Sequence, residues 1–313
     1  MKSQAHGRFV DLQREAFSAF EQKDYEGVRK LVKKIDGAFP KQRHRTVMWK
    51  MCSFALEGER DKAFEIGFEA LDEGIWWNPD RIKEEPGLAD LQEDPRFETF
   101  VARCRVKYNE ERDTRDPVLV SMGNPLSHQR LFAIHWRGDD AESFSEYFET
   151  TPRLADWHMG FPQSSQVHGY SRFCWDDEEK ALMVLKKSYE AFDEISVGGG
   201  ETLLCGASQG GKLAIDLALR HQPVPHHCFF AVVPSIKDLK AYESLLKEGV
   251  CSKVKGYILT GENDPYLQQQ RALHQLLLDY DVPCQFVVVE GLGHDFPENF
   301  NIFAEEAAAF LMK

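Results

Sequence analysis

From about residue 117 onward, short apolar runs alternate with segments of helical periodicity. This alternation constrains the fold more than any other feature of the sequence, because strand–helix–strand units place parallel strands in one sheet. The expected strands are Val118–Met122, Arg130–His135, Leu154–Met159, Thr202–Gly206, Cys228–Val233, Val254–Thr260 and Gln285–Glu290. The expected helices are Asp176–Phe192, Gly211–Arg220, Ile236–Glu248, Tyr266–Tyr280 and Asn299–Met312. The pattern predicts an α/β domain, with a doubly wound, mostly parallel sheet covered by helices on both faces.

The residues before this region show helical periodicity throughout. Apolar side chains recur at helical spacing from Phe9 onward, and the turns at Asp24 and Asp61 lie 37 residues apart. A spacing of this size is typical of repeated helical hairpins, and the segment resembles tetratricopeptide repeats. We therefore expect an all-α, tetratricopeptide-like domain of helical hairpins over residues 1–114, followed by the α/β domain over residues 115–313.

The charge balance argues against a nucleic-acid partner. The chain has 313 residues with 38 Lys+Arg against 51 Asp+Glu, a formal net charge of -13, whereas phosphate backbones are bound by basic surfaces. No run of 18 apolar residues is present, so no transmembrane segment is expected. The first residues lead into a charged amphipathic segment without the apolar core of a signal peptide. These features predict a cytoplasmic protein.

The seven cysteines are not arranged for disulfides or for a structural metal. They are scattered, odd in number and never spaced as Cys-x-x-Cys, so free thiols in a reducing compartment are expected. His226-His227 has no carboxylate or cysteine at ligand spacing, and Gly198-Gly199-Gly200 precedes a strand instead of following one. The sequence therefore predicts neither a metal nor an organic cofactor.

A Gly-x-Ser-x-Gly motif carries the strongest indication of chemistry. It spans Gly206-Ala207-Ser208-Gln209-Gly210, with an expected strand before it and an expected helix after it. A sharp strand-to-helix turn exposes the serine hydroxyl above the sheet, and glycines on either side avoid collisions with the neighbouring strand and helix. Ser208 is therefore the candidate nucleophile.

A nucleophilic serine needs a base, and the base needs an acid that orients it. Downstream of the motif, His294 follows the last expected strand in a glycine-flanked loop, and Asp264 follows the strand before it. Both positions lie just past the carboxyl ends of strands, where open α/β sheets build their sites. Asp264 would also serve as a helix N-cap, so Glu262 and Asp295 remain alternative acids.

The third requirement is an oxyanion hole of N–H donors. The backbone N–H of Gln209, directly after the candidate nucleophile, is expected to be one donor. The second donor is expected from a loop that follows an early strand. The segment Trp136-Arg137-Gly138-Asp139 forms such a loop after the expected strand Arg130–His135.

The C-terminal 199 residues resemble the α/β-hydrolase fold, closest to its phospholipase/carboxylesterase (acyl-protein-thioesterase-like) branch. The shared residues are His135, Gly138 and Asp139 in the oxyanion loop, Gly206, Ser208, Gln209, Gly210 and Gly211 around the nucleophile, Gly261 and Asp264, and Gly293 and His294. The resemblance implies a Ser208–Asp264–His294 triad, with the backbone of Arg137 as the second oxyanion donor. Trp136 stands where this branch has glycine. The segments Pro162–Gln166 and Phe173–Asp176 resemble its substrate side, without assigned roles.

The sequence thus predicts a carboxylesterase-like serine hydrolase that cleaves a small-molecule ester through an acyl-enzyme. Thioesterase or small-peptide hydrolase activity remains open, because triad chemistry does not choose the leaving group. A catalytically inactive hydrolase-fold adaptor is the alternative from another class, and Trp136 favours it. The helical domain could bind a protein partner or mediate self-association. Its Trp76-Trp77 pair is expected either to fill the domain's own core or to form an apolar surface near the active-site rim.

Overall fold

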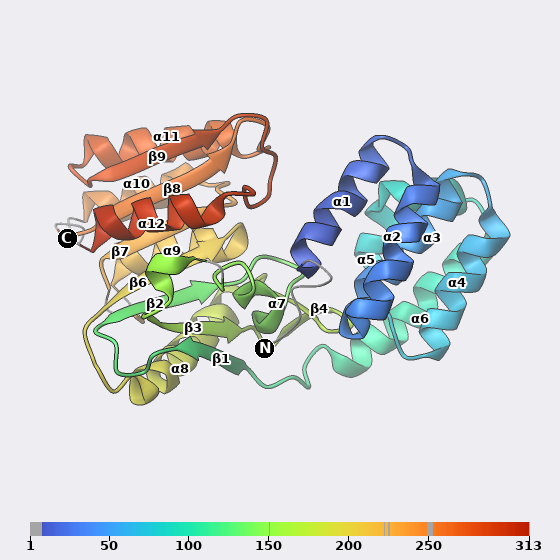
Figure 1. The fold of residues 1–313 in the computed structure, drawn as a ribbon, viewed down its shortest axis with the longest axis horizontal. Helices are drawn as coiled ribbons and strands as arrows, with labels where there is room; N and C mark the ends of the chain where they lie inside the picture. The colour runs from blue at the N-terminus through green and yellow to red at the C-terminus, as the bar shows by residue number, and fades with distance from the viewer. Residues whose placement is uncertain (1–7, 150, 222, 225, 249–252, 313) are drawn as a thin grey trace. The chain divides into compact units, whose positions relative to one another are not determined.

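The computed structural model describes residues 8–149, 151–221, 223–224, 226–248 and 253–312 (Figure 1). Over this part of the chain the structure forms two compact units. The helical unit contains the residues up to Thr114 together with Val167–Ser171, and the sheet unit contains Arg115–Gln166 and the residues from Arg172 onward. The short segment Val167–Ser171 thus belongs to the helical unit, although it lies within the range expected for the second domain.

The helical unit has the all-helical character that the periodicity predicts for residues 1–114. Its helices are α1 (Phe9–Glu21), α2 (Tyr25–Ala38), α3 (Arg43–Leu56), α4 (Arg60–Asp72), α5 (Pro79–Glu84) and α6 (Pro95–Glu111), with 3-10 turns at Pro40–Gln42 and Pro86–Leu91. Successive helices pack against one another, α1 on α2, α2 on α3 and α3 on α4 (Figure 1). Asp24 and Asp94 cap α2 and α6 by accepting hydrogen bonds from backbone N–H groups. The resemblance to tetratricopeptide repeats remains a prediction.

Both tryptophans of the Trp76-Trp77 pair lie in the interior of the helical unit. Their side chains are buried, with relative exposures of 1% and 6%. The Trp76 indole N–H donates to the carboxylate of Glu111 at 2.9 Å, and the Trp77 indole N–H donates to the His44 carbonyl at 3.3 Å. The Tyr170 backbone N–H donates to the Trp76 carbonyl, which holds the segment Val167–Ser171 in this unit. Of the two expected arrangements, a place in the domain's own core or an exposed apolar surface, the structure shows the first.

The sheet unit is built on seven strands in the order β1-β3-β2-β6-β7-β8-β9 (Figure 1). They are β1 (Val118–Gly123), β2 (Gln129–Ile134), β3 (His158–Gln163), β6 (Glu201–Ala207), β7 (Cys228–Val232), β8 (Lys255–Gly261) and β9 (Cys284–Val289). β1 runs antiparallel to β3, and the other neighbouring pairs are parallel. The mostly parallel sheet predicted from the alternation of strands and helices is confirmed.

Helices cover both faces of this sheet. They are α7 (Ala141–Ser145), α8 (Glu178–Ile195), α9 (Gln209–Arg220), α10 (Leu239–Lys247), α11 (Leu267–Asp279) and α12 (Phe300–Leu311). One face carries a hydrophobic cluster to which α8 to α11 contribute, among them Leu185 and Leu273, and which includes Phe229 of β7. The next residue, Phe230, points to the opposite face, where its ring stacks on Phe300 of α12. Burial on both faces explains why the central strands are continuously apolar.

One strand is shifted from its predicted position. The sequence predicts a strand over Leu154–Met159, whereas Pro152–Leu154 forms a 3-10 turn and β3 begins at His158. Leu154 is apolar because it is buried within this turn. Helix α7 and the hairpin of β4 (Gln166–Gly169) and β5 (Arg172–Cys174) are absent from the prediction. They are too short for hydrophobic periodicity to reveal.

The six cysteines in the described part of the chain are free thiols, and Cys251 lies outside it. Five are buried and Cys228 is partly buried. Burial raises the pKa of these thiols, to about 11 for Cys104 and to about 12 for Cys284. They are therefore protonated at neutral pH and act as small apolar core residues.

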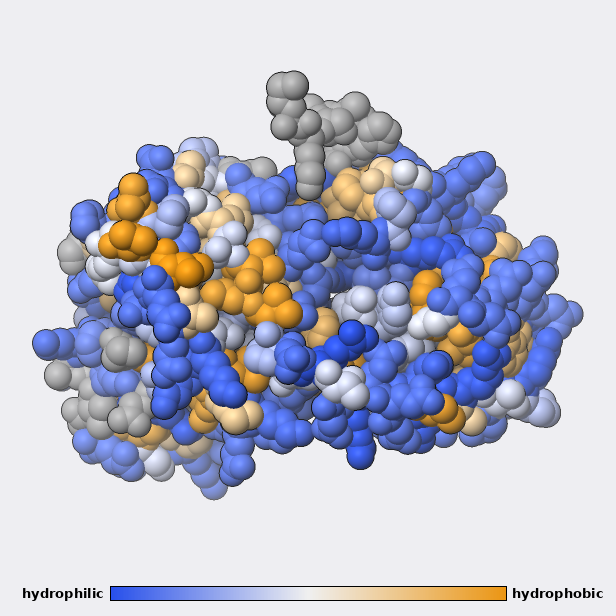
Figure 2. Space-filling view, turned by 90° about the horizontal axis from the view of Figure 1, so that it is seen from below, coloured by the Kyte–Doolittle hydropathy of each residue, from blue (hydrophilic) through white to orange (hydrophobic). Residues whose placement is uncertain are grey.

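The surface of the sheet unit carries scattered apolar side chains. Figure 2 views the molecule from the side of α8 and β1, and hydrophobic residues lie there in several small groups among hydrophilic ones. The exposed apolar side chains of the unit include Val118 of β1, Met183 of α8, and Leu126 and Val197 of two loops. Within the described residues, no helix combines the length and the apolar character needed to cross a membrane.

The stability of the protein should decrease as the pH falls from about 7 to about 4. The ring of His226 contacts the Tyr189 hydroxyl, and burial, with Arg130 nearby, lowers the pKa of His226 to about 4. Below the ordinary histidine pKa of about 6.5, the unfolded chain therefore binds a proton that the folded protein does not bind, and unfolding becomes more favourable. His226→Gln should weaken this dependence when urea midpoints are compared at pH 7 and pH 5. An unchanged difference between the two midpoints would contradict the expectation.

Candidate active site

Ser208 lies in the sharp turn between β6 and α9. Its backbone has φ 50° and ψ -111°, a conformation that non-glycine residues rarely adopt. Hydrogen bonds hold this conformation, because the Ser208 N–H donates to the Val232 carbonyl at 2.9 Å and the Ser208 carbonyl accepts from Ser235 and Lys212. The turn presents the Ser208 side chain at the carboxyl end of the strand, which is the geometry expected of a nucleophile elbow.

The glycines of the motif are required by close backbone contacts. A Cβ atom at Gly206 would lie 2.3 Å from the Gly210 carbonyl oxygen, and a Cβ atom at Gly210 would lie 2.0 Å from the Ile134 carbonyl oxygen. Real Cβ atoms do not approach backbone atoms so closely. The first turn of α9 therefore packs directly against the end of β2, where the expected oxyanion loop begins.

The structure brings the three sequence-predicted side chains of Ser208, His294 and Asp264 together. The Ser208 Oγ lies 2.8 Å from the His294 Nε2, and the His294 Nδ1 lies 2.8 Å from the Asp264 Oδ2. Because a carboxylate only accepts, the His294 Nδ1–H donates to Asp264, and in this tautomer of an imidazole Nε2 can accept the Ser208 proton. The Asp264 side chain is fully buried and that of His294 is 27% exposed.

Asp264 makes a second side-chain hydrogen bond, but it is not the N-cap of α11, which begins at Leu267 after Tyr266. Its Oδ1 accepts a hydrogen bond from the Tyr266 N–H at 2.7 Å just before α11, while its Oδ2 faces His294. The alternative acids make other contacts. Glu262 accepts from the Gly291 N–H at 3.0 Å, and Asp295 accepts from the Phe296 N–H at 2.7 Å.

The loop after β2 is fixed by His135. This histidine is buried, and burial lowers its pKa, so the ring is neutral. Its Nδ1–H donates to the Trp136 carbonyl at 2.7 Å, and its Nε2 accepts from the Ser164 N–H at 3.3 Å. The Trp136 carbonyl and the Arg137 N–H belong to one planar peptide group. His135 therefore sets the direction of the N–H that the sequence predicts as an oxyanion donor.

Trp136, which stands where the resembled branch has glycine, is built into this loop. Its indole N–H donates to the Asp139 carboxylate at 2.6 Å, and its ring contacts Tyr147 and Phe296 at centroid distances of 5.6 Å and 5.3 Å. Its φ lies outside the positive range that favours glycine. The large side chain thus stabilises the loop from the side of Phe296, two residues after His294.

Asp176 joins the side chains of the two expected oxyanion donors. Its carboxylate accepts a hydrogen bond from the Gln209 side-chain amide at 2.7 Å and forms an ion pair with the Arg137 guanidinium. The Gln209 side-chain oxygen accepts from the Trp175 N–H at 3.2 Å. The sequence alone predicts no role for Asp176. Gln209 lies 33 positions and Arg137 lies 39 positions from Asp176 along the chain, and no local spacing indicates contacts over such separations.

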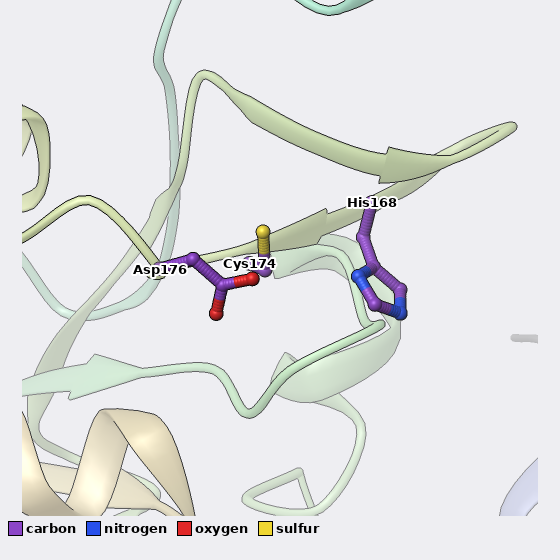
Figure 3. Close-up of side chains that lie close together, drawn as sticks. All are labelled: His168, Cys174 and Asp176. Carbon is purple, nitrogen blue, oxygen red and sulfur yellow. The ribbon is translucent and has the colours of Figure 1, made fainter. Parts of the chain in front are cut away.

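Within the described residues, His168, Cys174 and Asp176 offer ligand atoms that lie within 4.8 Å of one another (Figure 3). A metal ion bound here would have to displace the proton of the Cys174 thiol, whose pKa is raised to about 12 by burial and by the nearby Asp176 carboxylate. The Asp176 carboxylate is also engaged by Arg137 and Gln209. A ligand atom of this cluster is thus already paired with side chains of the protein.

Comparison with solved structures shows the fold. An uncharacterized protein from Bacillus cereus ATCC 10987 matches with a TM-score of 0.54 and 22% identity, covering 97% of this chain and 99% of that one. Esterase PE8 matches with a TM-score of 0.51 and 19% identity, and the match covers 63% of this chain and 100% of that one. Zea mays acyl-protein thioesterase 2 matches with a TM-score of 0.50 and 15% identity, and the match covers 62% of this chain and 97% of that one. No protein-family model and no curated protein matches the chain. The chain has the α/β-hydrolase fold, preceded by an all-helical region.

Proposed function

We propose that this protein is a carboxylesterase-like serine hydrolase that cleaves esters through an acyl-enzyme. The observation that carries the proposal is the continuous hydrogen-bonded chain from the Ser208 hydroxyl through His294 to the buried Asp264 carboxylate. A neutral imidazole that accepts a serine proton and is oriented by a carboxylate is the arrangement that activates a serine nucleophile. The strained elbow that presents Ser208 supports the same proposal.

In the proposed reaction the Ser208 Oγ attacks the ester carbonyl carbon while His294 Nε2 takes the hydroxyl proton. The tetrahedral intermediate collapses by breaking the bond to the leaving alkoxide, and His294 returns the proton to this group. A water molecule then attacks the acyl carbon while His294 Nε2 takes one of its protons. The second collapse breaks the bond between the acyl carbon and the Ser208 Oγ, which recovers the proton from His294 as the carboxylic acid leaves. Asp264 stabilises the imidazolium that forms in each half-reaction.

The negative charge that develops on the carbonyl oxygen needs preorganised donors. We assign this role to the backbone N–H groups of Gln209 and Arg137. Gln209 is the first residue of α9, and the N-terminal N–H groups of a helix have no partners within the helix. The Arg137 N–H is oriented through the hydrogen bond between His135 and the Trp136 carbonyl. Besides the ester and water, the reaction so assigned uses side chains and backbone groups of this chain.

The leaving group is the open part of the proposal. Esterase PE8 and the maize acyl-protein thioesterase share the fold, and a shared fold does not choose between esters, thioesters and small peptides. A panel of nitrophenyl esters, acyl thioesters and peptide anilides, each with short and long acyl groups, separates these classes. We expect the highest kcat/KM for an ester, and a thioester with a higher value at matched acyl length would reassign the leaving group.

A fluorophosphonate probe should label the wild-type protein at one site and fail to label Ser208→Ala. The probe reacts with a serine only when a base activates the hydroxyl and an oxyanion hole receives the phosphoryl oxygen. Labelling is measured by intact-protein mass, with heat-denatured protein as the control. Absence of labelling in folded wild-type protein would favour an inactive adaptor, and labelling that survives Ser208→Ala would point to another nucleophile.

A further inference from the structure

The segment Arg172–Asp176 braces the loop that carries Arg137. The Gly138 N–H donates to the Phe173 carbonyl at 2.7 Å, and the Phe173 N–H donates to the Asp139 carbonyl at 2.9 Å. From the same segment, the Arg172 side chain donates to the Gly138 carbonyl at 2.6 Å and the Trp175 indole N–H donates to the His135 carbonyl at 3.0 Å. Four hydrogen bonds thus fix the loop on this segment.

The same segment also holds the first residue of α9. The Gln209 side chain spans two of its residues, because its oxygen accepts from the Trp175 N–H and its nitrogen donates to the Asp176 carboxylate. Within this segment, the Asp176 side chain contacts both Gln209 and Arg137. We propose that Asp176 is a positioning residue that holds the Arg137 and Gln209 backbone N–H groups in register as one oxyanion hole. The inference rests on the proposed hydrolase function.

A merely structural role would predict a different result. The side chains of Arg137 and Asp176 are 31% and 48% exposed, and ion pairs that water reaches contribute little to stability. Removal of the carboxylate should therefore leave the folded protein nearly as stable as before. The donors, in contrast, must match the position of a developing charge closely, and a small displacement lowers the rate of the chemical step.

The experiment compares Asp176→Ala with Glu178→Ala in the full-length protein. Glu178 is the matched control, since it is an exposed carboxylate two residues away that pairs with Arg220 at 3.4 Å. We expect Asp176→Ala to lower kcat roughly tenfold with KM unchanged, a part of the 10²–10³-fold loss that removal of a whole donor causes. Glu178→Ala should keep the wild-type kcat. Fluorophosphonate incorporated at completion counts the competent sites and separates a slower site from a smaller folded fraction.

Two further measurements test the role in the oxyanion hole directly. The affinity for a phenylboronic acid, whose tetrahedral serine adduct resembles the intermediate, should fall in parallel with kcat in Asp176→Ala. Gln209→Ala keeps its backbone N–H, and the double variant Asp176→Ala/Gln209→Ala should lose little more than either single variant, because both remove the same link. Should Asp176→Ala fail to fold, Asp176→Leu provides the same comparison, because it retains a side chain of similar length without the oxygen that accepts from Arg137 and Gln209.

The possible outcomes distinguish a failure of the positioning role from a failure of the proposed function. If the wild-type protein hydrolyses esters and Asp176→Ala matches Glu178→Ala in kcat and boronate affinity, the positioning role is wrong and the proposed function stands. A loss confined to KM, or additive losses in the double variant, would equally overturn the positioning role. A wild-type protein that neither hydrolyses esters nor takes up the probe overturns the proposed function and this inference with it.

Discussion

Replacing Ser208 by alanine should lower kcat on an ester substrate by on the order of 10⁶-fold. The Ser208 Oγ lies 2.8 Å from the His294 Nε2, and without this oxygen no acyl-enzyme can form. The removed group lies at the turn between β6 and α9, whose backbone hydrogen bonds do not involve this side chain. The protein should therefore fold normally. The measurement is kcat and KM for a nitrophenyl ester, with circular dichroism as the control for folding.

His294→Ala should lower kcat by nearly the same factor as Ser208→Ala. The double variant Ser208→Ala/His294→Ala should have a kcat no lower than that of either single variant. Side chains that act as one unit lose most of the rate when any one is removed. Residual activity near the wild-type level in Ser208→Ala would show that another residue performs the attack. Losses that multiply in the double variant would show that the two side chains act in separate steps.

Asp264→Asn should lower kcat about 10⁴-fold while the protein remains folded. The asparagine side chain keeps the size of the buried carboxylate, and its oxygen can keep the hydrogen bond from the Tyr266 N–H. Its amide group, however, can donate to the His294 Nδ1. This stabilises the tautomer whose proton sits on Nε2, where the proton of Ser208 must be accepted. In the proposed site, Asp264 would thus set both the orientation and the tautomer of the His294 ring.

The controls for this variant are the neighbouring carboxylates. Glu262→Gln and Asp295→Asn should stay within about tenfold of the wild-type kcat, because their side chains accept hydrogen bonds from Gly291 and Phe296. Steady-state kinetics at one ester and a thermal melt suffice for all three variants. Wild-type activity in Asp264→Asn together with an inactive Glu262→Gln or Asp295→Asn would show that the acid is assigned wrongly.

The sequence predicted the sheet because local signals and the overall fold agree in this unit. Apolar strands, helical periodicity and turn residues alternate from β1 to α12, and each signal is short-range. The placement of Ser208, Asp264 and His294 just after their strands also followed from the sequence, since parallel strands end at one edge. The structure adds the distances between the side chains.

Other features depend on contacts between distant parts of the chain, which no local pattern reveals. Leu154 is an apolar residue of a 3-10 turn, and an apolar residue at this position is equally compatible with a strand. The sequence therefore predicted a start of β3 at Leu154, whereas the strand begins at His158. The residues Val167–Ser171 group with the helical unit through contacts such as Tyr170 to Trp76. In the sequence, Asp176 is one of several acidic residues at the start of a helix. Only the structure shows that it contacts Arg137 and Gln209.

The three side chains of the candidate site follow three different strands, and the contact from Ser208 to His294 joins residues 86 positions apart. Between them, β6, β7, β8 and β9 must pair in the correct register before the contact can form. Such long-range pairing is the slow part of folding. Ester hydrolysis would therefore report on the completed assembly of four of the seven strands. In refolding experiments the return of activity should accordingly trail the return of helical signal.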